Sequence, residues 1–314
     1  MKSAHLKHLG AAALLTLSAT AQVHASTLFP SLPTRTIGVQ VKIQNFTPAD
    51  AEQIKAAGFS FVRFGVWSDS LGGKTYQKQI SDAFATARSA GLPVLMTVRA
   101  TKPLTGDLTT AGESFANAVS GLEQAWSAQL VGIEIWNEPD LDTYWPTGDF
   151  KNTFVPFMTA MCKTLQGKPQ STPLVGFGFA RPPTAGSAST VALNSILGTY
   201  PECLDAISYH PYGMTATQIS NAQTFIQQNF RLPGVISEWG VSALASNGGP
   251  EGQASKISAF IADVKKLNIP LTSIYEWKNS ESGSNDREKN FGLLTSDGQP
   301  KPAQTAVSTH LNAD

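Results

Sequence analysis

Short apolar runs alternate with amphipathic segments along the chain from about residue 36 onward. The run TIGVQVKI at 36–43 is typical of a strand, and PADAEQIKAAG at 48–58 has a helical pattern that ends in glycine. The same pattern predicts strands at 59–67, 92–100, 130–136, 173–180, 204–210, 234–240 and 269–277. It predicts helices at 76–91, 113–129 and 154–167, within 187–199, and at 219–230, 254–268 and 301–311.

This alternation predicts a parallel sheet covered by helices. The predicted strands are apolar on both faces, as in sheets that have helices on both sides. The units follow one another without a linker or a change of composition. We therefore expect the α/β class and a single-domain (β/α)8 TIM barrel over residues 26–314. A doubly wound open sheet is the alternative, but no GxGxxG or phosphate-loop pattern follows the first strand.

The first 25 residues differ from the rest of the chain. Lys2 and Lys7 precede the apolar run LGAAALLTLSATA, and small residues lead to Ala25. This is the layout of a secretory signal peptide over residues 1–25, with a buried N-terminal helix as the alternative. The run is too short to span a membrane comfortably, and no other segment is long and apolar enough. We expect a secreted or periplasmic protein without a membrane span.

Charge and cysteine content narrow the possible partners. The 23 Lys and Arg residues are balanced by 23 Asp and Glu residues, so we expect no nucleic-acid partner. We also expect a monomer. Export permits a disulfide between Cys162 and Cys203, the alternative being two buried free thiols. Without the signal peptide only His210 and His310 remain as histidines, in different surroundings. We expect no cofactor and no metal site of His and Cys ligands, while an oxygen-ligated calcium ion stays open.

Two glutamates directly follow predicted strands, at the ends where a barrel enzyme carries its active site. Glu138 comes at the end of the fourth strand. Glu238 comes at the end of the seventh strand, in the segment VISEWG. Two carboxyl groups about 5–5.5 Å apart, one protonated and one ionised, can hydrolyse a glycosidic bond with retention of configuration. The other polar or aromatic residues near strand ends are Arg63, Trp67, Arg99, Asn137, His210, Tyr212 and Trp277.

These segments resemble a known group of enzymes. IEIWNEPD resembles the strand-four signature of the clan A glycoside hydrolases, which include families 5 and 39, and VISEWG resembles their strand-seven signature. ISYHPYG, IYEW and the tail FGLLTSDGQPKPA extend the likeness over roughly residues 36–312. The resemblance implies a retaining β-glycosidase with Glu138 as acid/base and Glu238 as nucleophile. The chain departs from family 5 at Arg99, where that family usually has a histidine.

The resemblance also implies roles for neighbouring residues. Arg63 would orient and ionise Glu238, and Tyr212 would hydrogen-bond to the same carboxylate. Asn137 would bind the sugar 2-hydroxyl, where contacts strengthen in the transition state. A structural ion pair is the alternative for Arg63, and a turn or cap role is the alternative for Asn137.

Three further positions have competing explanations. His210 would contact the sugar or Tyr212, with a purely structural role as the alternative. Trp277 would form the apolar platform under the bound sugar, with core packing as the alternative. For Arg99 we consider a sugar hydroxyl, an acidic substituent, or an ion pair with Glu134, which strand alternation places inside the barrel.

Aromatic residues in the predicted loops bear on the substrate. Trp67, Tyr144 and Trp145 offer flat apolar faces to pyranose rings, unless they only pack loops together. A groove lined by aromatic rings favours endo-acting hydrolysis of a β-linked polysaccharide, such as a plant cell-wall glycan or a bacterial exopolysaccharide. The alternatives are an exo-acting β-glycosidase, a transglycosylase and a non-catalytic carbohydrate-binding barrel.

Overall fold

The computed structural model describes residues 28–30, 32, 36–104 and 106–313. The expected signal peptide lies outside these residues. The strands are β1 (Ile37–Gln40), β2 (Val62–Trp67), β3 (Val94–Arg99), β4 (Leu130–Ile135), β5 (Leu174–Phe179), β6 (Ala206–Tyr209), β7 (Gly234–Trp239) and β8 (Thr272–Ile274). The longer helices are α2 (Pro48–Ala56), α3 (Lys74–Ser89), α4 (Leu108–Trp126), α5 (Phe150–Gln166), α6 (Ala188–Thr199), α7 (Ala216–Phe230), α8 (Gly249–Lys266) and α9 (Pro302–Asn312).

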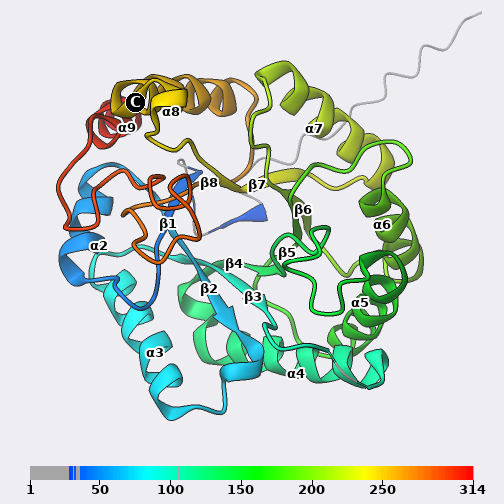
Figure 1. Cartoon of the computed structure of the whole chain (residues 1–314). Helices are drawn as coiled ribbons and strands as arrows, with labels where there is room; N and C mark the ends of the chain where they lie inside the picture. Colours follow the sequence, from blue (N-terminus) through cyan, green and yellow to red (C-terminus); the bar gives the residue numbers. More distant parts are fainter. Residues whose placement is uncertain (1–27, 31, 33–35, 105, 314) are drawn as a thin grey trace, which may run out of the picture.

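The strands form a closed parallel barrel in sequence order, with β8 beside β1. Figure 1 shows the helices as an outer ring around the strands. The predicted (β/α)8 barrel is therefore confirmed, and the open sheet is excluded. Some helix boundaries differ from the predicted ones. The helix α4 starts at Leu108 rather than 113, because the Asp107 side chain caps it by accepting hydrogen bonds from the Thr109 and Thr110 amides.

The interior of the barrel has an apolar end and a polar end. The apolar cluster at the amino-terminal ends of the strands consists of Phe29, Leu32, Phe61, Leu95, Val131, Val175, Ala206, Val235 and Leu271. Phe29 and Leu32 precede β1, so the start of the described chain closes that end. Closer to the carboxyl ends, the buried inward residues become polar, with Arg63, Thr97 and Glu134 on three neighbouring strands. This polar layer is the support on which the candidate site is built.

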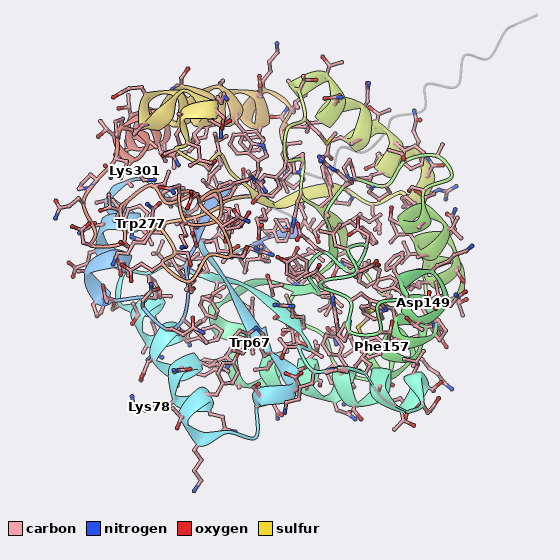
Figure 2. The ribbon with its side chains drawn as sticks, in the orientation of Figure 1. Trp67, Lys78, Asp149, Phe157, Trp277 and Lys301 are labelled. Atoms are coloured by element: carbon pink, nitrogen blue, oxygen red, sulfur yellow. A yellow bond between two sulfur atoms is a disulfide. The ribbon has the colours of Figure 1, made fainter. Side chains whose placement is uncertain are left out.

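An aromatic cluster joins the β4–α5 connection to the core. Trp145 is only 1% exposed, and its ring centroid lies 4.8 Å from that of Trp136 and 5.5 Å from that of Phe157. Its indole N–H donates to the Thr153 hydroxyl at 2.7 Å. Figure 2 shows Phe157 on α5, against which this cluster packs. The expectation that Trp145 offers a face to substrate is wrong, because both faces of the ring serve to pack the loop on α5.

Cys162 on α5 and Cys203 just before β6 form a disulfide, with their Cα atoms 5.3 Å apart. The predicted pairing is confirmed. No helix among the described residues has the length and hydropathy needed to cross a bilayer.

The disulfide closes a loop with a sequence separation of 41 residues, and we expect its reduction to lower the free energy of unfolding by about 3–4 kcal/mol. The cause is the larger conformational freedom of the unfolded chain once the bridge is broken. Urea unfolding of the protein with and without a reductant measures this difference. A Cys162→Ala/Cys203→Ala variant is the control, since it must no longer respond to the reductant. An unchanged unfolding midpoint on reduction of the native protein would contradict the prediction.

Candidate active site

Glu138 is held in place by a tightly bonded turn at the end of β4. Trp136 and Glu138 have φ angles of 73° and 51°, in the left-handed region that residues other than glycine seldom adopt. The Trp136 amide donates to the Val98 carbonyl at 2.8 Å, and the Glu138 amide donates to the Gly178 carbonyl at 2.7 Å. These bonds tie the turn to β3 and β5 on either side. The Glu138 carboxylate consequently has a defined position at the carboxyl end of the barrel.

Glu238 occupies the next-to-last position of β7, where it is almost buried. Arg63 donates to its Oε2 atom through Nη1 at 2.6 Å. The Tyr212 hydroxyl donates to its Oε1 atom at 2.9 Å. Both oxygens are thus held by donors, one of them a cation, and such charge-assisted hydrogen bonds are the stronger ones in proteins. The contacts expected of Arg63 and Tyr212 with Glu238 are confirmed.

Arg63 is the centre of a buried polar network. Its Nε and Nη2 atoms donate to Glu134 Oε2 at 3.0 and 2.7 Å, and the Thr97 hydroxyl donates to the same oxygen at 2.7 Å. Nη2 also donates to Asn137 Oδ1 at 2.6 Å, and Nη1 donates to Gln40. The guanidinium on β2 therefore connects β1, β4 and β7, and Glu134 extends the network to Thr97 on β3.

Charge complementarity keeps this network ionised although it is buried. Burial by itself lowers the pKa of Arg63, but the Glu134 and Glu238 carboxylates raise it, and the net shift is upward. Burial by itself raises the pKa of Glu134, but the charges of Arg63 and His210 and the hydrogen bonds of neighbouring hydroxyl groups together lower it more, and the net shift is downward. The considered pairing of Arg99 with Glu134 is wrong, because Arg63 already occupies that carboxylate.

His210 on the β6–α7 connection positions Glu138. Its Nδ1 atom lies 3.0 Å from Glu138 Oε1, and its Nε2 atom lies 3.2 Å from the Ser237 hydroxyl. Burial by itself lowers the pKa of His210, but the carboxylates of Glu238 and Glu138 raise it above its usual value. The ring is 0% exposed and packs edge-on against Tyr212 with centroids 6.5 Å apart. A sugar contact by His210 is therefore wrong, and its contact with Tyr212 is confirmed.

The two glutamates face one another across the end of the barrel. One carboxylate oxygen of Glu138, one of Glu238 and a ring nitrogen of His210 lie within 4.8 Å of one another. Three such ligands have the spacing to hold a metal ion. They fit one poorly, because Arg63 already places a positive charge on Glu238 and His210 is already bonded to Glu138. The arrangement suits proton transfer and nucleophilic attack by the carboxylates themselves.

The aromatic residue at the end of β8 is Tyr275 rather than Trp277. Trp277 is 2% exposed, its indole donates to Asp50 on α2 at 3.1 Å, and its ring meets the edge of Phe59 (Figure 2). The expected sugar platform at Trp277 is wrong, because β8 ends at Ile274 and the chain then turns toward α2. Tyr275 stays half-buried at the site. Burial, then the charges of neighbouring carboxylates including Glu238, raise its pKa. Strand alternation places Tyr275 on the same face as Leu271, but it places Trp277 there too, so only the end of β8 at Ile274 separates the two.

Glu276 is a buried carboxyl group beside the site that the sequence analysis also missed. It is 2% exposed, its Oε2 atom lies 3.3 Å from Lys42 Nζ, and its Oε1 atom has no hydrogen-bond partner among the described residues. Burial raises its pKa to about 7, Lys42 opposing the shift and Glu238 adding to it.

We expect Glu276→Gln to flatten the dependence of stability on pH between pH 4.5 and 7. A carboxyl group whose pKa is raised by folding binds its proton more tightly in the folded state, so the native protein loses stability as the pH rises through this window. A shift from 4.5 to about 7 corresponds to about 3 kcal/mol. Urea unfolding at pH 4.5 and pH 8 measures the slope, with the exposed Glu281→Gln as control. Equal slopes for Glu276→Gln and the native protein would contradict the prediction.

The remaining candidate residues line the edge of the site and are partly exposed. The Arg99 guanidinium lies over the Tyr144 ring, 5.6 Å from its centroid. Trp67 stacks on Tyr76, with centroids 5.5 Å apart and the rings nearly parallel, and its label in Figure 2 lies at the end of β2. Asn137 has a half-buried side chain whose oxygen is used by Arg63. The structure thus brings together all expected site residues except Trp145 and Trp277.

Comparison with protein-family models and with curated proteins found no match to the sequence. Comparison with solved structures found many barrels of the same fold. A family 39 glycoside hydrolase from Bacteroides cellulosilyticus is similar with a TM-score of 0.70 and 18% identity, over 88% of this chain and 63% of that one. An exo-β-1,4-mannosidase from an Opitutaceae bacterium has a TM-score of 0.61 and 14% identity, over 89% of this chain and 59% of that one.

A third similar structure is a broad-specificity endoglucanase from Clostridium acetobutylicum, with a TM-score of 0.65 and 15% identity over 92% of this chain and 99% of that one. The chain spans less than two thirds of the length of the first two proteins. At these identities the likeness shows the fold. The class defined by fold and site together is a (β/α)8 barrel with paired carboxylates at the carboxyl ends of its strands.

Proposed function

We propose that this protein is a retaining glycoside hydrolase of the clan A type, acting on a β-linked polysaccharide. The observation that carries the proposal is the approach of Glu138, after β4, and Glu238, on β7, with carboxylate oxygens within 4.8 Å of each other. This spacing agrees with the roughly 5 Å separation of retaining enzymes and is too short for the attacking water of inverting ones. The solved barrels to which this chain is similar include glycoside hydrolases, which supports the same proposal.

The different partners of the two carboxylates assign their roles. Glu238, held by Arg63 and Tyr212, is the nucleophile that attacks the anomeric carbon and forms a glycosyl-enzyme. Glu138 donates its proton to the leaving oxygen and then takes a proton from the water that hydrolyses the intermediate. His210 bonds only one Glu138 oxygen, so the other remains for the substrate. Asn137, with its oxygen on Arg63, presents its amide to the sugar 2-hydroxyl.

The accessible rings at the edge of the site support an endo-acting mode. Trp67, Tyr144 and Tyr275 are each partly exposed, and each can pack against a pyranose ring. A chain bound across them would reach the glutamates at an internal linkage. We also propose that residues 26–314 form the mature protein and that it is exported, which its disulfide supports.

A mechanism-based label tests the function. An activated 2-deoxy-2-fluoro β-glycoside is expected to attach covalently to Glu238. The fluorine slows both formation and hydrolysis of the glycosyl-enzyme, and the good leaving group restores the rate of formation alone, so the intermediate accumulates. Peptide mass spectrometry identifies the labelled residue, and proton NMR of a turned-over aryl glycoside gives the first anomer released. Labelling of another residue, or release of the inverted anomer, would contradict the mechanism. Failure to hydrolyse any aryl β-glycoside would favour a non-catalytic carbohydrate-binding barrel.

A further inference from the structure

Arg99, at the end of β3, is a half-buried cation whose guanidinium has no acceptor among the described residues. Arg63, on the neighbouring strand, has two carboxylates. The side-chain contact of Arg99 is instead with the face of Tyr144, 5.6 Å from the ring centroid. Burial lowers the pKa of Arg99, which shows that the charge is partly removed from water. The charges of Asp69 and Glu138 act on Arg99, but neither carboxylate is hydrogen-bonded to the guanidinium. A half-buried cation without a hydrogen-bonded anion is costly, so an anion supplied from outside would stabilise this arrangement.

The strand register places Arg99 on the inner side of the barrel next to an open wall. Arg99 pairs in register with Trp67, and the residue two positions earlier, Thr97, pairs with Gly65. Gly65 is exposed, and a Cβ atom at this position would meet no atom within 4 Å. The inner surface of β2 is therefore bare between Arg63 and Trp67. Arg99 is the last residue of β3 and Glu138 follows the neighbouring β4, so both residues lie at the carboxyl end of the barrel.

The β2–α3 connection, which follows Trp67, lines a separate cavity that has two lysines and one carboxylate. It has a volume of about 540 Å³ and is lined by Asp69, Ser70, Gly72, Gly73, Lys74, Thr75, Tyr76 and Lys102. Tyr76 joins the two regions, because it lines the cavity, stacks on Trp67 and lies within the field of Arg99.

The only carboxylate in this lining is already used by the loop. Asp69 Oδ2 accepts hydrogen bonds from the amides of Thr101 and Lys102 at 2.7 and 2.6 Å. Burial by itself raises the pKa of Asp69, but these amides lower it, so the group stays ionised with its oxygens engaged. Lys102 also donates from Nζ to the Asp69 carbonyl at 3.3 Å. The guanidinium of Arg99 is therefore the group on this side that an external anion can meet.

We propose that Arg99 forms a subsite for a carboxylate group on the glycan, so that the substrate is an anionic rather than a neutral polysaccharide. A planar guanidinium binds a carboxylate through two parallel hydrogen bonds, a geometry that a lysine does not reproduce. Tyr144 holds the guanidinium from one face and leaves its edge for the ligand. The carboxylate belongs to a uronic acid or to a pyruvate ketal on a neutral sugar. The cleavage of such a glycan rests on the proposed hydrolase function, but its binding does not.

Matched glycan pairs test the subsite. The probes are oligosaccharides with uronic acids, the same oligosaccharides after reduction of their carboxylates to alcohols, and pyruvylated oligosaccharides before and after removal of the ketal. Binding is measured by calorimetry in a Glu238→Gln background, which prevents turnover. We expect at least one acidic member to bind about tenfold or more tightly than its neutral counterpart, and the pair that responds identifies the source of the carboxylate. The preference should weaken at high salt.

Substitutions assign the preference to one side chain. Arg99→Gln is expected to remove the difference between acidic and neutral members, Arg99→Lys to retain part of it, and Arg88→Gln on α3 to leave it unchanged. No preference for any acidic member, or an undiminished preference in Arg99→Gln, would overturn the proposal. Labelling of Glu238 without an acidic preference would refute this subsite alone. Arg99-dependent binding of acidic glycans without labelling or hydrolysis would instead refute the proposed hydrolase.

Discussion

Replacing Glu238 with alanine is expected to lower kcat for the polysaccharide by about 10⁴-fold or more, because the covalent step loses its nucleophile. The space left beside Arg63 and Tyr212 can admit a small anion such as azide. Azide should therefore restore turnover of an aryl β-glycoside with a good leaving group, and the product should be the α-glycosyl azide, since azide attacks from the side of Glu238. Product NMR and initial rates with and without azide measure both effects.

The matched comparison is Glu138→Ala. The decrease in the turnover rate of this variant should be small for substrates whose leaving groups need no proton and large for the polysaccharide, because the variant lacks the proton donor. Azide should here give the β-glycosyl azide, since it attacks a glycosyl-enzyme still formed on Glu238. The buried but remote Glu123→Gln is the control for removing a carboxylate. The same azide anomer from both alanine variants would show that the two glutamates do not have the distinct roles proposed.

Arg63→Met is expected to lower the free energy of unfolding by about 3–5 kcal/mol. Glu134 is 0% exposed, and without Arg63 its carboxylate would be buried with no opposite charge beside it. The loss should be smaller at pH 4 than at pH 7, because burial then raises the pKa of Glu134 and protonation removes the uncompensated charge. Urea unfolding at the two pH values measures the effect, and circular dichroism checks that the variant is folded.

A double variant separates the ion pair from simple packing. Arg63→Met/Glu134→Gln should be more stable than Arg63→Met alone at pH 7, since neither charge remains, while Glu134→Gln alone should also be destabilised. If the changes in the free energy of unfolding caused by the two substitutions were additive, the ion pair between Arg63 and Glu134 would not be the source of the stability. Activity should stay low in the double variant, because Glu238 has lost its cationic partner in both cases.

The barrel could be predicted from the sequence because its cause is local. Eight apolar strands alternating with amphipathic helices have few ways to bury both faces of a sheet, and a closed parallel barrel is one of them. Closure brings the carboxyl ends of all strands to one end of the molecule. Glu138 and Glu238, 100 positions apart in numbering, were therefore expected to meet, and the structure places them within 4.8 Å. Their catalytic roles stay predictions.

Which neighbours these glutamates have was decided only by the tertiary structure. Arg63 and Arg99 both point inward from adjacent strands, and the register that aligns Thr97 with Glu134 brings Arg63 to that carboxylate while Arg99 stays one layer closer to solvent. A shift of one residue in register would change the partners, and no local pattern specifies it.

Exposure of the aromatic and histidine side chains was likewise beyond the sequence. Trp145 and Trp277 follow strand ends as Tyr144 and Tyr275 do, yet both tryptophans are buried and both tyrosines stay partly exposed. His210 is buried beside Glu138, whereas Tyr212 is partly exposed. The sequence determined that aromatic and ionisable residues gather at the carboxyl ends of the strands. The tertiary structure decided which of them remain accessible, because burial depends on the partners that distant elements offer. Trp145 packs on the phenylalanines of α5, and Trp277 is held by Asp50 of α2 and by Phe59.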